Sequence, residues 1–183
     1  IYFFEIPILE ESVAILPIVQ FPNPILEKPC ADVTEITTDI RQLAADMAET
    51  MYKAPGVGLA APQVGRSLRM IVMDVSEDKN NLMTLINPEI IEVSEEVCTG
   101  EEGCLSLPGI WEKVERHTAV TVRFMNLEGE EVTMPAEGLL AICIQHELDH
   151  LKGTVFIDHL SRLKYDRACA KLKKRRAQAA KSA

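Results

Sequence analysis

The sequence predicts an α+β fold in which a central, buried helix packs against antiparallel or mixed β-sheets. Three patterns support this class: a helix at residues 136–152 that is apolar on nearly every face, short β-prone runs before it, and further helical patterns near both ends of the chain. With 183 residues and 47% hydrophobic side chains, the chain can bury one substantial core but is short for two ordinary domains. We therefore expect a single domain over residues 1–183.

The helix in the N-terminal half is expected at residues 37–52, where apolar side chains recur at helical spacing. They are Ile40, Leu43, Ala44, Met47 and Met51. Ala54-Pro55-Gly56 follows and ends the helix, because proline disfavours helix in the residue before it. The next segment, GVGLAAPQVG, is rich in small residues, and taken alone it predicts only a turn.

Several short runs of β-prone residues are separated by polar residues or proline. Strands are expected at residues 68–75, 82–87 and 89–93, with a hairpin formed by residues 118–125 and 130–134. These runs predict the sheet region of the fold.

The helix expected at residues 136–152 ends at Gly153, a common helix terminator. One face carries Leu139, Ile142, Cys143, His146 and His150, and another carries Leu140, Ile144, Leu148 and Leu151. A helix that is apolar nearly all round is buried, so we expect this one at the centre of the fold.

The chain ends in a basic helix, expected at residues 161–183. This stretch contains nine Lys or Arg residues and only one acidic residue, Asp166, which gives it a net charge of +8. Because the whole chain carries −9, the residues before it carry −17. Such a surface argues against a membrane or DNA as partner, and any contact with a polyanion is expected to use the C-terminal helix.

The five cysteines are odd in number, widely spaced and free of C-x-x-C pairs, which favours a reducing, cytoplasmic setting over a disulfide framework. The opening residues are apolar, but Glu5, Glu10 and Glu11 interrupt them and no Lys or Arg precedes Lys28. We therefore expect neither a signal peptide nor a transmembrane helix there, and we treat residues 1–13 as an extension.

His146-Glu147-Leu148-Asp149-His150 matches H-E-x-x-H on a predicted helix. Two imidazoles four residues apart lie on one helix face and can bind one metal ion, and Glu147 can then take a proton from a water on that metal. The alternative is a pair of core histidines, but two buried imidazoles on an apolar face would need unusual polar partners. The pattern therefore favours a catalytic metal site.

A catalytic site of this kind needs a third protein ligand. Asp158 and His159 lie downstream of the helix pair but not at the spacing of the common zinc peptidases. Cys104 lies in GEEGCLSLPG, whose glycines and proline suggest a constrained turn or strand end, while Cys143 precedes His146 by one helical turn. The residues alone leave both cysteines open. One thiolate with two imidazoles would accept Fe(II), Zn, Ni or Co.

Three segments together resemble the signature motifs of peptide deformylases, in that family's order: GVGLAAPQ at residues 56–63, EGCLS at 102–106 and QHELDH at 145–150. The resemblance runs from about Ile15 to the C-terminus, and the basic last helix is similar to that of bacterial members. It implies that Cys104, His146 and His150 hold one divalent metal ion, natively Fe(II), for which Zn, Ni or Co can substitute.

The resemblance also implies roles for the residues around the metal. Glu147 would be the acid/base carboxylate, with the Gln63 amide and the Leu105 backbone N–H stabilising the developing oxyanion. Glu102 would be a carboxylate behind the metal ligands, with Arg116 as its basic partner. The implied substrate is the N-formylmethionine of a nascent polypeptide, and the products are formate and a free N-terminal methionine.

An apolar slot for that methionine is expected beside the metal, because several small or apolar residues share the face of the metal ligands or belong to the glycine segment. They are Gly56, Val57, Gly58, Leu139, Ile142 and Cys143. Some members of the family carry an arginine near the substrate seven residues after the cysteine, but this chain has Trp111 there. Contacts to the peptide beyond methionine are therefore expected to differ.

Two other functions fit parts of the pattern. A metallopeptidase would use the same H-E-x-x-H chemistry to cleave internal peptide bonds. A ribosome- or RNA-binding module would use the basic helix and hold a purely structural metal, closed by a fourth protein ligand. The same helix could also bring a deformylase to the ribosome near the exit tunnel.

Overall fold

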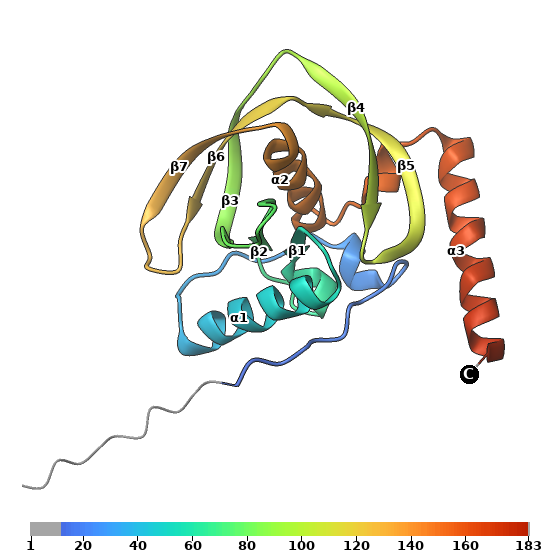
Figure 1. Ribbon diagram of the computed structural model, residues 1–183, viewed down its shortest axis with the longest axis horizontal. Helices are drawn as coiled ribbons and strands as arrows, with labels where there is room; N and C mark the ends of the chain where they lie inside the picture. The colour runs from blue at the N-terminus through green and yellow to red at the C-terminus, as the bar shows by residue number, and fades with distance from the viewer. Residues whose placement is uncertain (1–11, 183) are drawn as a thin grey trace, which may run out of the picture.

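The computed structural model describes residues 12–182, so most of the extension expected at residues 1–13 lies outside the described residues. Two antiparallel sheets curve around helix α2 (Gly138–Leu151). Helix α1 (Thr38–Lys53) lies beneath them, and α3 (Arg162–Ser182) runs along one side (Figure 1). The predicted α+β class with a central helix is confirmed.

The larger sheet has the strand order β1-β2-β3-β6-β7, and each neighbouring pair is antiparallel. Its strands are β1 (Gly58–Ala60), β2 (Met70–Met73), β3 (Met83–Val93), β6 (Ala119–Met125) and β7 (Glu131–Glu137). The predicted hairpin is β6 and β7. The two strands predicted at residues 82–87 and 89–93 form the single strand β3, whose register shifts between Ile86 and Glu89. Pro88 lies at this irregularity, where a residue without an N–H is tolerated.

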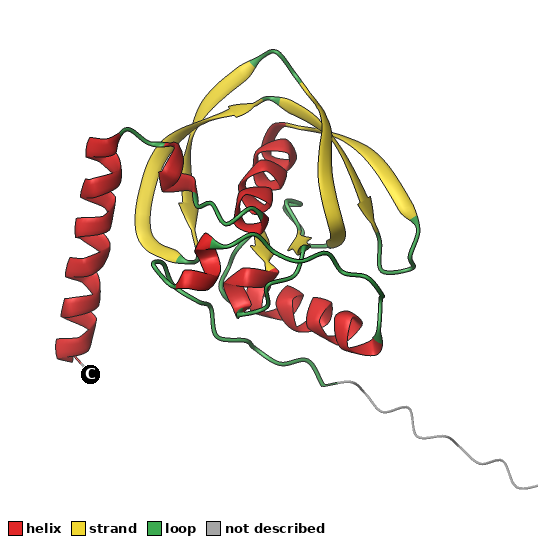
Figure 2. Cartoon of the chain, turned by 180° about the vertical axis from the view of Figure 1, so that it is seen from behind, coloured by secondary structure: helices red, strands yellow, loops and turns green. Residues whose placement is uncertain are grey.

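The smaller sheet pairs β4 (Val97–Cys104) with β5 (Leu107–His117) and was not predicted from the sequence. Strand β4 contains two residue types that are depleted in strands, glycine and glutamate, at positions 100–103. Its composition therefore does not predict a strand. Cys104 does lie at a strand end, as expected, beside a register shift that follows Gly103. Figure 2 shows this pair of strands from behind, arched beside α2.

Helix α2 begins at Gly138, two residues later than predicted. Ala136 still pairs with Val120 in the sheet, and Gly138 has a φ of 58°, which lets the chain turn from β7 into the helix. Most of the helix is buried, as expected. Leu139 is the main departure, because its first-turn position leaves it 56% exposed.

Three apolar clusters fill the molecule. The first lies between α2 and the five-stranded sheet, and the second between α1 and strands β1 and β2. The third joins β5 to α3 and to two short 3-10 helices, η1 (Pro24–Glu27) and η3 (Phe156–His159). Helix α3 contributes Ala168 and Leu172 to this cluster, and its residues beyond Leu172 are exposed. Among residues 12–182, no helix combines the length and the apolar composition needed to cross a bilayer.

Asp74, just after β2, fixes the segment that leads from α1 into β1. Its buried carboxylate accepts hydrogen bonds from the Tyr52 hydroxyl at 2.6 Å and from Ser76 N at 3.0 Å. Its own N–H donates to Val57 O at 2.9 Å. Burial acts to raise the pKa of Asp74, but hydrogen bonds from Ser76 and Tyr52 outweigh it and lower the pKa.

We predict that Asp74→Asn lowers the free energy of unfolding at pH 7 by on the order of 1–2 kcal/mol, because an amide replaces an acceptor-only carboxylate among several donors. Since folding lowers the pKa of Asp74, its stabilisation is present above the ordinary aspartate pKa and is lost as the pH falls through the folded value. The difference between wild type and variant should therefore shrink below about pH 4. Urea denaturation at pH 7 and pH 3 measures it.

Asp78→Asn is the matched control, since Asp78 lies in the same loop and is exposed. An equal loss in both variants, or a difference that grows on acidification, would contradict the assignment to Asp74.

Candidate metal centre

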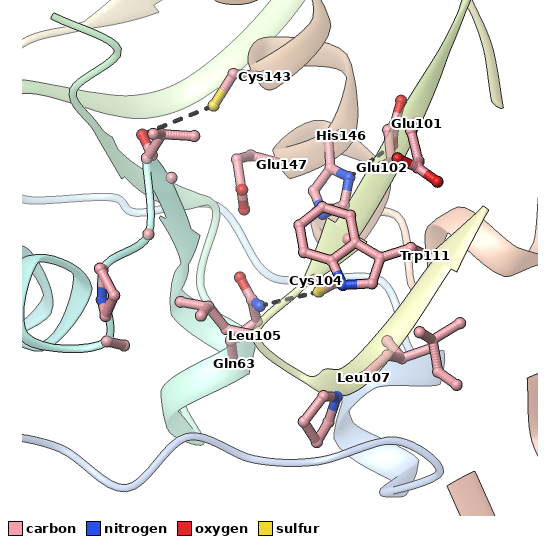
Figure 3. Close-up of a pocket in the computed structure, with 18 of the residues that line it drawn as sticks. Gln63, Glu101, Glu102, Cys104, Leu105, Leu107, Trp111, Cys143, His146 and Glu147 are labelled. Carbon is pink, nitrogen blue, oxygen red and sulfur yellow. Dashed lines mark hydrogen bonds and ion pairs between the residues drawn. The ribbon is translucent and has the colours of Figure 1, made fainter. Parts of the chain in front are cut away.

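Cys104, His146 and His150 bring one ligand atom each to within 4.8 Å of one another. The two imidazoles come from successive turns of α2, and the thiol comes from the end of β4. Figure 3 shows His146 and Cys104 on these two elements. Cys104 Sγ lies 3.3 Å from His150 Nε2. The register shift after Gly103 turns the end of β4 toward α2, so the irregular backbone is what delivers the thiol.

The other candidate ligands lie elsewhere. Cys143 Sγ donates to Val57 O at 3.8 Å and is not part of the three-residue group (Figure 3). Asp158 accepts a hydrogen bond from Val155 N, and His159 Nε2 lies 2.7 Å from an Asp149 carboxylate oxygen. Geometry therefore favours Cys104 over Cys143 as the thiol at this site.

Behind the candidate ligands, two buried charged residues hold His146 in place. His146 Nδ1 lies 2.8 Å from Glu102 Oε2, and Glu102 is paired with Arg116 through bonds of 2.8 and 3.0 Å. With Nδ1 engaged, His146 Nε2 remains to face the thiol. Glu102 and Arg116 thus stand where the sequence placed a carboxylate and its basic partner.

The same contacts set the charges of the site. Burial acts to raise the pKa of Glu102, but hydrogen bonds from His146 and Arg116 bring it down to about 2. Burial acts to lower the pKa of His146, yet hydrogen bonds with Cys104 and Glu102 raise it well above the usual histidine value. Burial lowers the pKa of His150 well below that value, which keeps the second imidazole neutral. A neutral imidazole is the form that binds a metal, so His146 would have to release its additional proton on becoming a ligand.

Glu147 lies between the histidines and the glycine segment. Burial raises its pKa to about 7, and its Oε2 has no hydrogen-bond partner among the described residues. Gly58 packs against it so closely that a Cβ there would lie 2.6 Å from Glu147 Oε1. A buried carboxylate held beside a metal site can accept and return a proton.

Gln63 reaches the site from the 3-10 helix η2 (Ala61–Val64). Its side-chain oxygen accepts from Ala60 N at 2.9 Å, which fixes the amide orientation. Its nitrogen then donates to Ser106 Oγ at 3.1 Å. It also lies 3.4 Å from Cys104 Sγ, the contact that Figure 3 marks. Leu105 lies beside it in the same cavity. No role for Ser106 was predicted, although its place two residues after Cys104 in CLS was a signal.

These side chains open into a cavity of about 510 Å³. It is lined by all six residues expected to form an apolar slot, namely Gly56, Val57, Gly58, Leu139, Ile142 and Cys143. Val57 and Leu139 are partly exposed at its mouth. The lining therefore combines a polar wall, formed by Gln63, Cys104, His146 and Glu147, with an apolar wall formed by these six residues.

Trp111 lines the cavity and is 63% exposed, so it lies at the cavity's mouth. It pairs across the two-stranded sheet with Gly103, and a Cβ on that glycine would lie 2.8 Å from the indole. The indole can lie flat on the strand because Gly103 has no side chain. The cavity thus has an aromatic edge.

The residues around the site suit a divalent metal. The donor set is one thiol and two imidazoles, which matches ions of intermediate softness such as Fe(II) and Zn. Three protein ligands leave one position open, as in catalytic rather than structural sites. Glu147, which lines the same cavity, has a buried oxygen without a protein partner that a water molecule could satisfy.

Comparisons with known proteins agree with this geometry. A family model described as polypeptide deformylase matches residues 15–166. The chain is 53% identical to a peptide deformylase from Acinetobacter baumannii over 161 residues, which are 88% of this chain and 92% of that protein. It is 51% identical to peptide deformylase 1 from Ralstonia nicotianae, covering 92% and 99% of the two chains.

Solved structures give the same result. The crystal structure of a peptide deformylase from Legionella pneumophila is similar with a TM-score of 0.86 and 44% identity, covering 91% of this chain and 98% of that one. A peptide deformylase from Ehrlichia chaffeensis in complex with actinonin gives a TM-score of 0.86 and 40% identity, covering 89% and 98% of the two chains.

We predict that Cys104→Ala reduces the bound metal to below about a tenth of one ion per chain after desalting, since two imidazoles alone bind weakly. Cys143→Ala should retain the metal, because its thiol points to Val57 O. Metal analysis of both variants, with circular dichroism to confirm folding, makes the comparison. Metal loss from the Cys143 variant alone would contradict the assignment.

Proposed function

Because the chain belongs to the polypeptide deformylase family, whose metal-dependent members remove the N-formyl group from nascent polypeptides, we propose that the cavity around Cys104 is where it does so. The observation that supports this most strongly is that the Cys104 thiol, the His146 imidazole, a buried carboxylate and an oriented amide all border one cavity with an apolar wall. The His150 imidazole brings a third ligand atom to within 4.8 Å of those of Cys104 and His146. Family membership makes the chain a formamide hydrolase rather than a metallopeptidase.

Cys104, His146 and His150 are the proposed ligands of one divalent ion, and we assign Fe(II) as the native ion, with Zn, Ni or Co able to replace it. When bound, such an ion polarises a carbonyl oxygen and lowers the pKa of a water molecule. Glu102 and Arg116 support this set by fixing the His146 ring with Nδ1 turned away from the other ligands.

Glu147 is the proposed general base and acid. It takes the proton from the attacking water as the new C–O bond forms at the formyl carbon, and passes it to the departing nitrogen as the C–N bond breaks. Formate and a free N-terminal methionine result. Its burial and the close fit of Gly58 hold the carboxylate at the reacting centre.

Gln63 and Leu105 are the proposed donors to the formyl oxygen as negative charge develops on it. The Gln63 amide is fixed by Ala60 N and anchored on Ser106, so its longer contact with Cys104 Sγ is the one that a substrate oxygen can replace. Leu105 directly follows the proposed ligand Cys104, which supports a role for its backbone N–H at the same centre.

The apolar wall is the proposed pocket for the methionine side chain. Leu139, Ile142 and Cys143 come from α2, and Gly56, Val57 and Gly58 from the segment before and within β1. A Cβ at Gly56 would lie 2.9 Å from Leu105 Cδ1, and one at Gly58 would lie 2.8 Å from Cys143 Sγ, so glycine at both positions allows this wall to pack closely. The polypeptide beyond methionine would then leave the cavity past its mouth, where Trp111 stands in place of the arginine of some family members.

The nascent chain also suggests where the enzyme works. We propose a cytoplasmic location, which agrees with five unpaired cysteines, and a single deformylase domain over residues 1–183. The basic helix at residues 161–183, observed as α3, is the proposed contact with the ribosome near the exit tunnel. Its exposed far end carries consecutive cations that could meet RNA phosphates.

We predict that Glu147→Gln lowers kcat for formate release from formyl-Met-Ala-Ser by about 10²- to 10⁴-fold while the metal is retained, because the amide keeps the shape but cannot carry the proton. The assay uses protein prepared anaerobically and loaded with Fe(II) or Ni, and metal content is measured on the same samples. The unformylated peptide should be left intact.

Wild-type protein that held its metal yet released no formate would overturn the proposed function. Cleavage of internal bonds in the unformylated peptide would support the peptidase alternative, and unchanged turnover in Glu147→Gln would remove that residue from the mechanism.

We predict that replacing Lys173, Lys174 and Arg176 by glutamate weakens cosedimentation with ribosomes and reduces its dependence on salt concentration. These positions are exposed, whereas truncation after Ser161 would also remove the buried Ala168 and Leu172. Formate release from the free peptide should not change. Equal, salt-independent cosedimentation of both proteins would count against ribosome contact.

A further inference from the structure

His159 has no part in the proposed reaction, yet it lies at the outer end of an unbroken series of polar contacts that reaches the His146 ring. His159 Nε2 and Arg116 Nη1 each lie 2.7 Å from Asp149 Oδ2. The other edge of the guanidinium is bound to Glu102, whose Oε2 lies 2.8 Å from His146 Nδ1. Five side chains are thereby joined in order.

The series passes from the interior to the surface. The side chains of Glu102 and Arg116 are only 7% and 6% exposed, Asp149 is 15% exposed and His159 is 41% exposed. Charged groups so far from solvent depend on one another for hydrogen bonds, and each bond is stronger than it would be in water. The position of each buried side chain therefore depends on its hydrogen-bond partner nearer the surface: Glu102 on Arg116, Arg116 on Asp149, and Asp149 on His159.

Asp149 links His159, at the surface end of the series, to Arg116, which is buried. A carboxylate with one donor can swing about its χ angles, but Asp149 Oδ2 accepts from Arg116 and from His159 together. The guanidinium is planar, so holding its Nη1 fixes the direction in which Nε and Nη2 meet Glu102. Glu102 in turn fixes which His146 nitrogen faces the thiol.

The contacts also join four separate elements. Glu102 is in β4, Arg116 in β5, Asp149 in α2 and His159 in η3. The sheet that carries Cys104 and the helix that carries both histidines are thus tied by the same set of charges. A shift of η3 relative to α2 would therefore change the orientation of the His146 imidazole through these hydrogen bonds.

We propose that His159 and Asp149 are positioning residues that act through Arg116 and Glu102 to hold the His146 imidazole in its metal-binding orientation. This inference rests on the proposed role of His146 as a metal ligand. Neither positioning residue touches the substrate or the reacting atoms, so their effect should appear in how tightly the metal is held.

The test compares His159→Phe, which keeps a ring but has no donor, with His159→Gln, whose amide N–H can still reach Asp149. The measured quantity is the rate at which Ni-loaded protein loses its metal to excess chelator. Direct partners of metal ligands change metal affinity by about 10–100-fold, and His159 is three contacts further out, so we expect about threefold faster loss in the Phe variant. The Gln variant should return close to the wild-type rate.

A purely structural role for His159 predicts a different result. In that case the thermal midpoint would fall in the Phe variant while the rate of metal loss stayed at the wild-type value, and this outcome would overturn the proposal. Arg162→Ala is the matched control, since it removes an exposed ion pair with Asp166 just after η3 and should leave metal loss unchanged.

A double-mutant cycle tests the route. If His159 acts through Asp149, then His159→Phe should add nothing to metal loss in an Asp149→Asn background. If the two substitutions increased the rate of metal loss additively, the proposal that His159 acts through Asp149 would be overturned. Wild-type protein that held no metal would overturn the ligand assignment itself, whereas wild type that holds metal with no effect in any His159 variant would overturn only the present inference.

Discussion

The structure depends on one constraint: Glu147 and His150 are buried, and His146 is only 11% exposed, on a helix that also supplies much of an apolar core. Burying such groups without partners is costly, so the surrounding elements must supply them. Strand β4 brings Cys104 and Glu102, and the partners of these two residues follow from β5 and η2. The small sheet is therefore as much a part of the metal site as the helix is.

Different interactions fix the polar and the apolar wall of the cavity. The polar wall is fixed by hydrogen bonds, such as Ala60 N to Gln63, that leave each functional group one orientation. The apolar wall depends on close approach, because Gly58 lets β1 pass within contact of Glu147 and Cys143. Asp74 then holds the preceding segment through the Val57 carbonyl. A hydrolase for a small formyl group attached to an apolar residue needs both kinds of wall.

Local patterns predicted the helices well and the strands unevenly. Helices α1 and α2 were found within two residues of their ends, because periodic apolar residues and glycine or proline stops are local signals. Strand β4 was missed because Glu101, Glu102 and two glycines are poor strand formers, and its pairing with β5 is a tertiary effect. Strand β3 was divided in two because the sequence shows Pro88 but not the irregular register that accommodates it.

The sequence by itself determined the α+β class, the two histidines on one helix face and, through three short motifs, the family. Residue spacing alone left Cys104 and Cys143 as competing thiols, because it says nothing about where a loop or strand end is directed, and only the family resemblance implied Cys104. Only the tertiary structure brought Cys104 to 3.3 Å from His150 and turned Cys143 toward Val57. It alone also joined His159 to Asp149 and Arg116, since contacts between β5, α2 and η3 arise from packing and not from any local pattern.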